Sequence, residues 1–359
     1  MASPSSIAKS LKLLEGPQTL GKGRGFWSGF ILVVAAACIY PLFADGYDVG
    51  NNVYFFNWTF MALGLSLIWG YGGALSFGQT AFFGVAGYAY GVLTINLGDA
   101  YGLTLVSLVA AVAISSLLAA VLGYFLFFGR ISGVFLGIVT LSVTLVLERF
   151  MAQTAGPEWH IGSARLNGFN GMGGMPSLTI PWPGGDIALF PDVTLYYLTL
   201  GLLVLVYLGL RMLVNSRFGN VLVAIRENPL RAEMLGYDIR KYQLGAFVIG
   251  SALAALSGIL YTSWGNYITP SSMGMTAAAL PIVWVAVGGR SDLTTTLLGT
   301  LLVLSGFQAL TIHGSQYALV AMGVLLVATV LLAPTGIIIA LGSLVSGRLK
   351  RRKTAREMS

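Results

Sequence analysis

Charge is what this chain most conspicuously lacks. Only 9% of its 359 residues are charged, against about 25% in an ordinary soluble domain. By contrast, 56% are hydrophobic and the mean hydropathy is +0.81. Such a chain has too few polar side chains to cover a water-exposed surface. The composition excludes a soluble globular protein and predicts an integral membrane protein built from helices.

Cysteine and histidine are nearly absent as well. The single cysteine, Cys38, excludes an internal disulfide and a cysteine-cluster metal site. The two histidines, His160 and His313, stand far apart, so no metal site is predicted. The apolar runs contain no paired carboxylates and no Ser/His/Asp grouping. We therefore predict no catalytic residue, no bound cofactor and no enzymatic activity.

One motif has a residue spacing similar to that of a nucleotide-binding site. Residues 16–23 read Gly-Pro-Gln-Thr-Leu-Gly-Lys-Gly, which has the glycine and lysine spacing of a phosphate-binding loop. Gly23 stands where that loop needs a Ser or Thr to ligate magnesium, and no strand is predicted before it. The motif is not expected to bind nucleotide.

Apolar runs of the length needed to cross a bilayer recur along the chain. About 20 apolar residues are needed per helix, and breaks at Gly, Pro or charge delimit ten such runs. The predicted spans are 27–45, 53–71, 74–96, 103–128, 131–153, 194–214, 242–263, 275–289, 293–312 and 316–338. We expect one transmembrane domain over residues 27–340.

Basic residues sort to one side of this topology. With the N-terminus inside, eighteen of the twenty Lys and Arg residues fall on the cytoplasmic side. The predicted cytoplasmic parts are a basic segment at 1–26, the loop 215–241 and a basic tail at 341–359. The net charge of +7 then reflects topology and contact with anionic lipid rather than nucleic-acid binding.

Ten spans divide into two five-helix halves around an outer loop at 154–193. The first half runs from inside to outside and the second from outside to inside, which is the topology of an inverted repeat. The outer loop is rich in Gly and Pro. It either receives a soluble solute-binding partner or caps the helices.

A glycine-rich, polar break separates the second and third spans. Non-helical backbone at membrane depth is tolerated where it lines a cavity or is covered by protein, and such breaks often mark a transport path. The predicted path residues are Gly72, Gly73, Ser76, Gln79 and Thr80. A plain loop is the alternative. In the other half, the 274–289 segment, interrupted by Pro281, is its counterpart.

Glu148 and Arg149 are ionisable residues that lie within a predicted span, near the outer end of the fifth. Ionisable groups inside a span usually mark proton or ion relays. We expect these two to pair at the interface instead. Uphill transport would then draw its energy from another chain.

An island of charge interrupts this apolar chain between residues 211 and 241. It holds nine of the 33 charged residues. Asn228 suits a helix N-cap, Pro229 the first helical position and Gly236 the residue just past the end. The helix between them, 229–235, is too short to be stable alone, so the island predicts a partner. Residues 220–226 are predicted to form a preceding amphipathic helix.

Residues 217–247 resemble the cytoplasmic coupling loop of bacterial ABC importer permeases of the branched-chain amino acid family, which also includes urea and short-chain amide permeases. The resemblance rests on residues 226–228 (Arg-Glu-Asn), Ala232 with Glu233, Gly236 and Tyr242. Residues 72–84 and 284–290 resemble two further signatures of the family. The first of these departs from the family at Gln79, where His is common.

The resemblance implies a permease subunit in the bacterial inner membrane. It would pair with a second related permease, two cytoplasmic ATPase subunits that bind ATP and magnesium, and a periplasmic binding protein. The implied ATPase-coupling residues are Glu227, Asn228, Pro229, Ala232, Glu233, Leu235 and Gly236. The implied substrate is a branched-chain or hydrophobic amino acid. Urea or a short amide is the alternative, and an ion-coupled secondary transporter is a further one.

Overall fold

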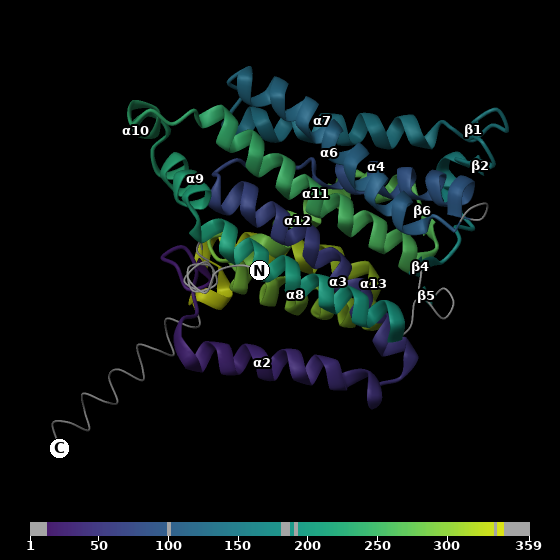
Figure 1. Cartoon of the computed structure of the whole chain (residues 1–359), viewed down its shortest axis with the longest axis horizontal. Coiled ribbons are helices and arrows are strands. Elements are labelled where there is room, and N and C mark those ends of the chain that lie inside the picture. The colour runs from purple at the N-terminus through teal and green to yellow at the C-terminus, as the bar shows by residue number, and fades with distance from the viewer. Residues whose placement is uncertain (1–12, 99–101, 181–186, 190–192, 334–335, 341–359) are drawn as a thin grey trace, which may run out of the picture.

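The apolar runs form long helices that cross the molecule side by side (Figure 1). The computed structural model describes residues 13–98, 102–180, 187–189, 193–333 and 336–340. Its longer helices are α2 (Gly23–Ile39), α3 (Gly46–Leu65), α4 (Gln79–Leu93), α6 (Thr104–Phe128), α7 (Gly133–Ala152), α8 (Val193–Asn215), α11 (Ile239–Gly265), α12 (Met275–Gly288) and α13 (Leu293–Leu332). Two short helices, α9 (Arg217–Glu227) and α10 (Pro229–Met234), project at one end of the bundle.

The prediction of an all-α membrane protein is confirmed. Among the described residues, eight helices are long and apolar enough to cross a membrane. Two further apolar helices, Met275–Gly288 and Tyr317–Leu332, are shorter. Together they account for the ten predicted spans; the eighth agrees with its predicted bounds to within one residue, and the tenth ends at Leu332 rather than 338.

Some predicted span boundaries were wrong, among them that of the first span, whose helix begins at Gly23 rather than 27. The third span begins at Gln79 rather than 74, because residues 74–78 are not helical. α3 begins at Gly46 rather than 53, since its polar first turns continue the helix beyond the apolar run. The predicted division between the ninth and tenth spans is confirmed, because α13 consists of two helices, Leu293–Ile312 and Tyr317–Leu332, on either side of a kink with non-helical backbone at Gly314. A Cβ built at Gly336 contacts Gly289, just before α13, so the chain turns back at Gly314.

α11 occupies the centre of the bundle and packs against α3, α4 and α6. Its small residues permit this. Gly250 lies against the backbone of Gly64 on α3, and Gly258 lies against the backbone of Phe83 on α4. A Cβ at any of these glycines would clash, as expected for close helix packing in lipid. A second-half helix thus sits among first-half helices, and the inverted relation of the halves stays a prediction.

The outer loop lies at the end of the bundle opposite α9 and α10, where the short strands gather (Figure 1). Strands β1 (His160–Ile161) and β2 (Ala164–Arg165) pair with each other, as do β4 (Leu178–Ile180) and β5 (Ile187–Leu189). β3 (Met172–Gly173) pairs with β6 (Tyr267–Ile268), directly after α11.

The loop also packs onto α4. The Asn96 side chain, at the outer end of that span, donates to the carbonyl of Ile161 at 2.8 Å and accepts from the N–H of Ser163 at 2.9 Å. These contacts show the loop capping the helices. Docking of a binding protein there stays a prediction.

At the α9–α10 end, residues 13–22 form a strap anchored by Arg211 of α8. Arg211 is fully buried. Its guanidinium donates to the carbonyls of Leu14 at 3.0 Å, Leu20 at 3.3 Å and Gly21 at 2.8 Å, and to the Tyr207 hydroxyl at 2.8 Å. A buried cation is tolerated because its donors are satisfied.

The strap contains the motif that imitates a phosphate-binding loop. The N–H of Gln18 donates to Asn215 Oδ1 at 3.0 Å, and the N–H of Leu20 donates to Asp292 Oδ2 at 2.6 Å. Backbone N–H groups that would cradle a phosphate are therefore bonded within the chain. The geometry supports the prediction that this motif does not bind nucleotide.

Replacing Arg211 with Met is expected to release the strap, because three backbone carbonyls of the strap lose a charged donor. The estimated loss of stability is about 3 kcal/mol. Thermal unfolding in detergent measures the loss, and tryptic cleavage after Lys22 measures strap release. The control is Arg217→Met, since Arg217 is exposed on α9. Equal unfolding midpoints and cleavage rates for both variants would contradict the anchoring role.

Candidate functional site

The charged island folds as two short helices, α9 and α10, which project from one end of the bundle. α9 buries Val221, Leu222 and Ile225 on one face, which confirms the predicted amphipathic helix. It ends because Asn228 precedes a proline, which disfavours helical backbone. Asn228 is extended, with φ −157° and ψ 97°.

The predicted caps of α10 are confirmed. Asn228 Oδ1 accepts from the N–H of Arg231 at 2.9 Å, and Pro229 is the first helical residue. Gly236 has φ +88°, a left-handed conformation that suits glycine. The N–H of Tyr237 donates back to the carbonyl of Ala232 at 3.2 Å. The helix ends at Met234, with Leu235 as its C-cap.

A small apolar cluster holds α10 to α9. Ala232 is buried and packs with Val221 and Ile225, and Ile239 and Tyr242 cover them. A six-residue helix could not persist without such support. Of the seven predicted coupling residues, Ala232 thus faces inward, whereas Glu227, Asn228, Pro229, Glu233, Leu235 and Gly236 are exposed.

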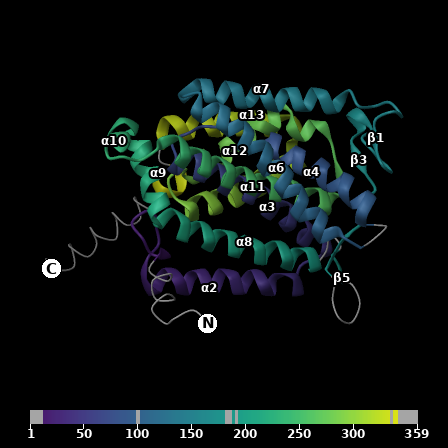
Figure 2. The ribbon, with the colours of Figure 1, turned by 45° about the horizontal axis from the view of Figure 1, so that its top comes forward.

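The outer face of α10 is apolar. Leu230, Met234 and Leu235 are 72%, 89% and 70% exposed, on a segment that projects beyond the ends of the spans (Figures 1 and 2). Clustered large apolar side chains on a polar loop mark a protein interaction site. The sequence prediction missed Leu230 and Met234. The available signal was their four-residue spacing, which places both on one face of a helix.

Charged groups surround this face. Glu233 lies 3.8 Å from Arg130 of the α6–α7 turn, an exposed and therefore weak pair. Asp238 precedes α11, and a hydrogen bond from Lys241 lowers the pKa of its carboxyl. Its negative charge at a helix N-terminus is favourable.

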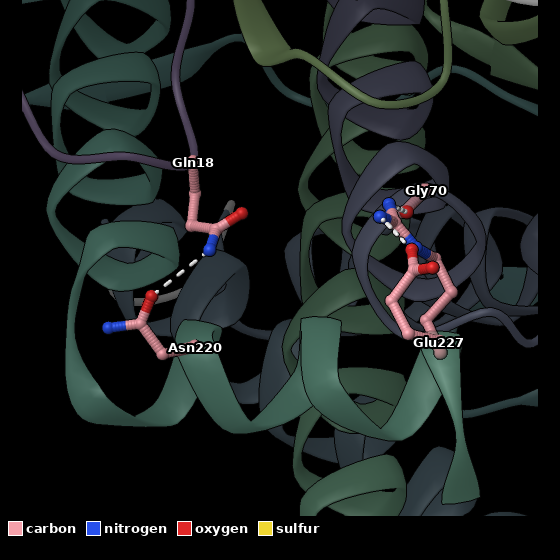
Figure 3. A network of polar contacts seen from close by, with 5 residues as sticks. Gln18, Gly70, Asn220 and Glu227 are labelled. Atoms are coloured by element: carbon pink, nitrogen blue, oxygen red, sulfur yellow. Dashed lines mark hydrogen bonds and ion pairs between the residues drawn. The ribbon is translucent and has the colours of Figure 1, made fainter.

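Two polar side-chain contacts between α9 and other segments are drawn in Figure 3. The Gln18 side chain, from the strap, donates to Asn220 Oδ1 at 3.2 Å. Arg226 donates from Nη1 to the carbonyl of Gly70 at 2.6 Å, and its other nitrogens bond to Glu227 Oε1. Gly70 belongs to η2, a π-helical segment (Ser66–Tyr71) that ends the second span.

The Gly70 carbonyl lies in the last turn of its helix, where carbonyls need partners from outside the helix. Arg226 supplies one. The same segment meets the 284–290 signature, because Ser66 Oγ donates to the Arg290 carbonyl at 3.2 Å and the Arg290 guanidinium lies 5.1 Å from the Trp69 ring. The three signature segments therefore meet at η2. We call Gly70, Arg226 and Arg290 the η2 junction.

The predicted path residues fall into two groups. Gly72 and Gly73 directly follow η2, and a Cβ at Gly73 would lie 3.0 Å from the Arg226 side chain. Ser76, Gln79 and Thr80 are buried.

The break itself is held by polar contacts. Phe77 donates its N–H to Thr140 Oγ1 of α7 at 3.1 Å, and Gly78 donates its N–H to Ser76 Oγ at 3.1 Å. Within the described part of the chain, the Gln79 amide and the Thr80 hydroxyl have no hydrogen-bond partner. Buried polar atoms normally have one; that a solute supplies it here stays a prediction.

Aromatic rings lie next to these two residues. Phe83, one turn beyond Gln79, stacks on Trp58 of α3 with ring centroids 4.8 Å apart. Trp58 also contacts Tyr261 and Trp284. The polar start of α4 therefore adjoins a large apolar surface.

Comparison with known proteins identifies the family. The family model described as "Branched-chain amino acid transport system / permease component" matches residues 51–333. The chain is 36% identical over 98 residues to a probable branched-chain amino acid transport permease protein, LivM, of Methanocaldococcus jannaschii, covering 27% of this chain and 28% of the relative.

Two further relatives agree. LivH of the same organism, also a probable branched-chain amino acid transport permease protein, is 26% identical over 161 residues, or 42% of this chain and 50% of the relative. BraD of Pseudomonas aeruginosa, a high-affinity branched-chain amino acid transport system permease protein, is 32% identical over 137 residues, or 37% and 44%.

The matched segments span half the length of these relatives or less. No solved structure matches. The family model nevertheless covers most of the chain, so the chain belongs to the permease-component family of branched-chain amino acid transport systems.

Proposed function

We propose that this chain is the membrane-embedded permease subunit of an ATP-driven importer of branched-chain or other hydrophobic amino acids. The observation that carries the proposal is the exposed apolar face of α10, held to α9 by a buried cluster. A face of this kind needs a soluble partner, and the partner proposed is a cytoplasmic ATPase.

The contacts of α9 and α10 give the route by which motion of the ATPase would reach the membrane spans. Leu230, Met234 and Leu235 would insert into a cleft of the ATPase, with Glu233 and Gly236 at its rim. Because α10 packs on α9, closure of the ATPase would move both helices together. Arg226 would carry that motion to Gly70 and to the path residues that follow it.

An external energy source is supported by the pair of charged residues near the outer end of the fifth span. Glu148 and Arg149 lie 3.5 Å apart, as an interfacial pair would. Such a pair offers no route for a proton or ion across the membrane. This favours ATP over an ion gradient and disfavours the ion-coupled alternative.

The proposal also includes the other subunits of the importer and the orientation of this chain in the membrane. A second related permease, two ATPase subunits and a periplasmic binding protein would complete the importer in the bacterial inner membrane. One end of the bundle contains helices α9 and α10, the strap, and the turn between α12 and α13 that holds Arg290. Basic residues mark that end as cytoplasmic, which would put both chain termini there.

The proposed substrate class rests on the surroundings of Gln79. Its amide and the Thr80 hydroxyl could receive polar groups of an amino acid, while the aromatic surface at Trp58 and Phe83 suits an apolar side chain. Urea has no apolar part to use that surface.

Replacing Met234 with Lys should weaken ATPase association by about 30-fold, a loss typical of an interface hot spot. The side chain is 89% exposed, so folding should be unaffected. Co-purification of the ATPase and solute uptake are the measurements. The control, Phe169→Lys, alters a similarly exposed apolar residue on the outer loop. Normal association and uptake in the Met234 variant would contradict the docking proposal.

Replacing Arg226 with Ala should uncouple hydrolysis from transport, because the contact with Gly70 is lost while the docking face remains. ATPase association should persist, and the ratio of solute imported to ATP hydrolysed should fall at least about 10-fold, equivalent to about 1.4 kcal/mol. Arg217→Ala is the control, since Arg217 is exposed at the start of the same helix, α9. An unchanged ratio would remove Arg226 from the transmission step.

The substrate is tested with the complete transporter and its binding protein. Leucine, isoleucine or valine should raise the melting temperature of the binding protein, because a ligand that binds the native state stabilises it. Stabilisation by urea or a small amide alone would overturn the amino-acid assignment and leave the coupling assignment intact.

A further inference from the structure

An apolar groove separates α2 from the rest of the bundle. α2 runs along one edge of the molecule, beside α8, in both views (Figures 1 and 2). The groove has a volume of about 470 Å³ and lies between α2, α8, the start of α13 and Phe56 of α3. Its walls include Phe30, Leu203 and Leu297.

α2 is attached to the bundle but not packed into it. No residue of α2 is buried. Phe30 stacks on Tyr207 with centroids 5.6 Å apart, and the Tyr196 and Tyr197 hydroxyls donate to the carbonyls of Ala37 and Cys38 at 2.8 and 2.9 Å. These contacts hold α2 in place along its length and leave the groove open.

Two glycines keep the groove wide. Gly25 and Gly29 both line it, and a Cβ built at either would contact nothing within 4 Å. Small residues that face open space do not serve helix packing. They leave room for a molecule that the chain itself does not supply.

The lining selects a hydrocarbon occupant. It is almost wholly apolar, and its hydroxyls at one end, Tyr207 and Thr294, are bonded to each other at 2.7 Å. Water has too few partners there to be stable. The lining residues of α2 run from Gly25 to Ala37, about 18 Å of helix. That is just over half of a hydrocarbon core about 30 Å thick, the depth of one leaflet.

The charges at one end of the groove select an anionic headgroup. Lys22 and Arg24 are exposed beside Gly25, where α2 begins. The Glu15 carboxylate is also close, but it accepts from the N–H of Gly23 and from the Trp27 indole. Arg211 and Asp292, which also lie at this end, are of opposite charge and both bonded within the chain. Lys22 and Arg24 against the bonded Glu15 therefore leave this end positive. Basic groups at a membrane surface attract anionic lipid.

We propose that this groove binds one acyl chain of an anionic phospholipid, whose phosphate lies beside Lys22 and Arg24. The lipid would fill the space between α2, α8 and α13. It would thereby stabilise the region next to Tyr207 and Thr294, both of which bond to Arg211. The site does not depend on the transported solute or on the coupling assignment.

The test uses the full-length chain in its purified transporter complex. Native mass spectrometry counts retained phosphatidylglycerol against phosphatidylcholine, and thermal unfolding is measured as each lipid is added. One phosphatidylglycerol should be retained, with at least a 10-fold preference over phosphatidylcholine. The unfolding midpoint should rise with phosphatidylglycerol.

Three variants sharpen the result. Gly29→Leu should fill the groove and abolish retention and stabilisation. Gly201→Leu is the matched control, because Gly201 is an exposed glycine of α8 with open space around it and does not line the groove. The double variant Lys22→Gln, Arg24→Gln should keep lipid retention but lose the anionic preference.

Equal binding of both lipids to the unaltered complex would overturn the proposal, and so would full retention by the Gly29 variant. A cross-link from α2 in the complex to a helix of the second permease across the groove would also overturn it, since the occupant would then be protein.

Discussion

Backbone hydrogen bonding in lipid is the constraint on which this structure depends. A membrane-spanning helix satisfies its own N–H and C=O groups, and every interruption leaves groups that hydrocarbon cannot satisfy. The chain interrupts its spans after Tyr71 and places the break where other segments supply partners. Arg226 donates to Gly70, and Thr140 accepts from Phe77. The break is therefore tied both to a helix outside the membrane and to a neighbouring span.

The same constraint explains why the three signature segments, which lie far apart in the sequence, meet in space. A π-helical turn exposes the Gly70 carbonyl, the adjoining Ser66 reaches the Arg290 carbonyl, and Arg226 arrives from α9. The glycines at 70 and 73 leave no room for a Cβ beside these partners. A movement of α9 cannot occur without changing contacts at the start of the proposed solute path. Mechanical coupling of this kind needs no charge inside the membrane.

Much of the architecture could be predicted because membrane helices are encoded locally. Apolar run length predicted the spans, and Asn228, Pro229 and Gly236 predicted α10 and its caps, since capping depends on residues a few positions apart. The prediction was wrong where hydropathy alone set the boundary. Residues 74–78 are apolar enough for a span, yet glycine and side-chain hydrogen bonds hold them out of helical conformation.

The sequence by itself determined that the chain is a helical membrane protein, that its spans are interrupted near residue 72, and that residues 228–236 form a capped helix. These depend on composition and short-range chemistry. Only the tertiary structure decided that Ala232 faces inward while Leu230 and Met234 face outward, that the strap closes over Arg211, and that Arg226 meets Gly70. These pairings join residues up to about two hundred positions apart. Long-range contacts are set by how helices pack, and no local pattern records which side chain of a helix will find its partner.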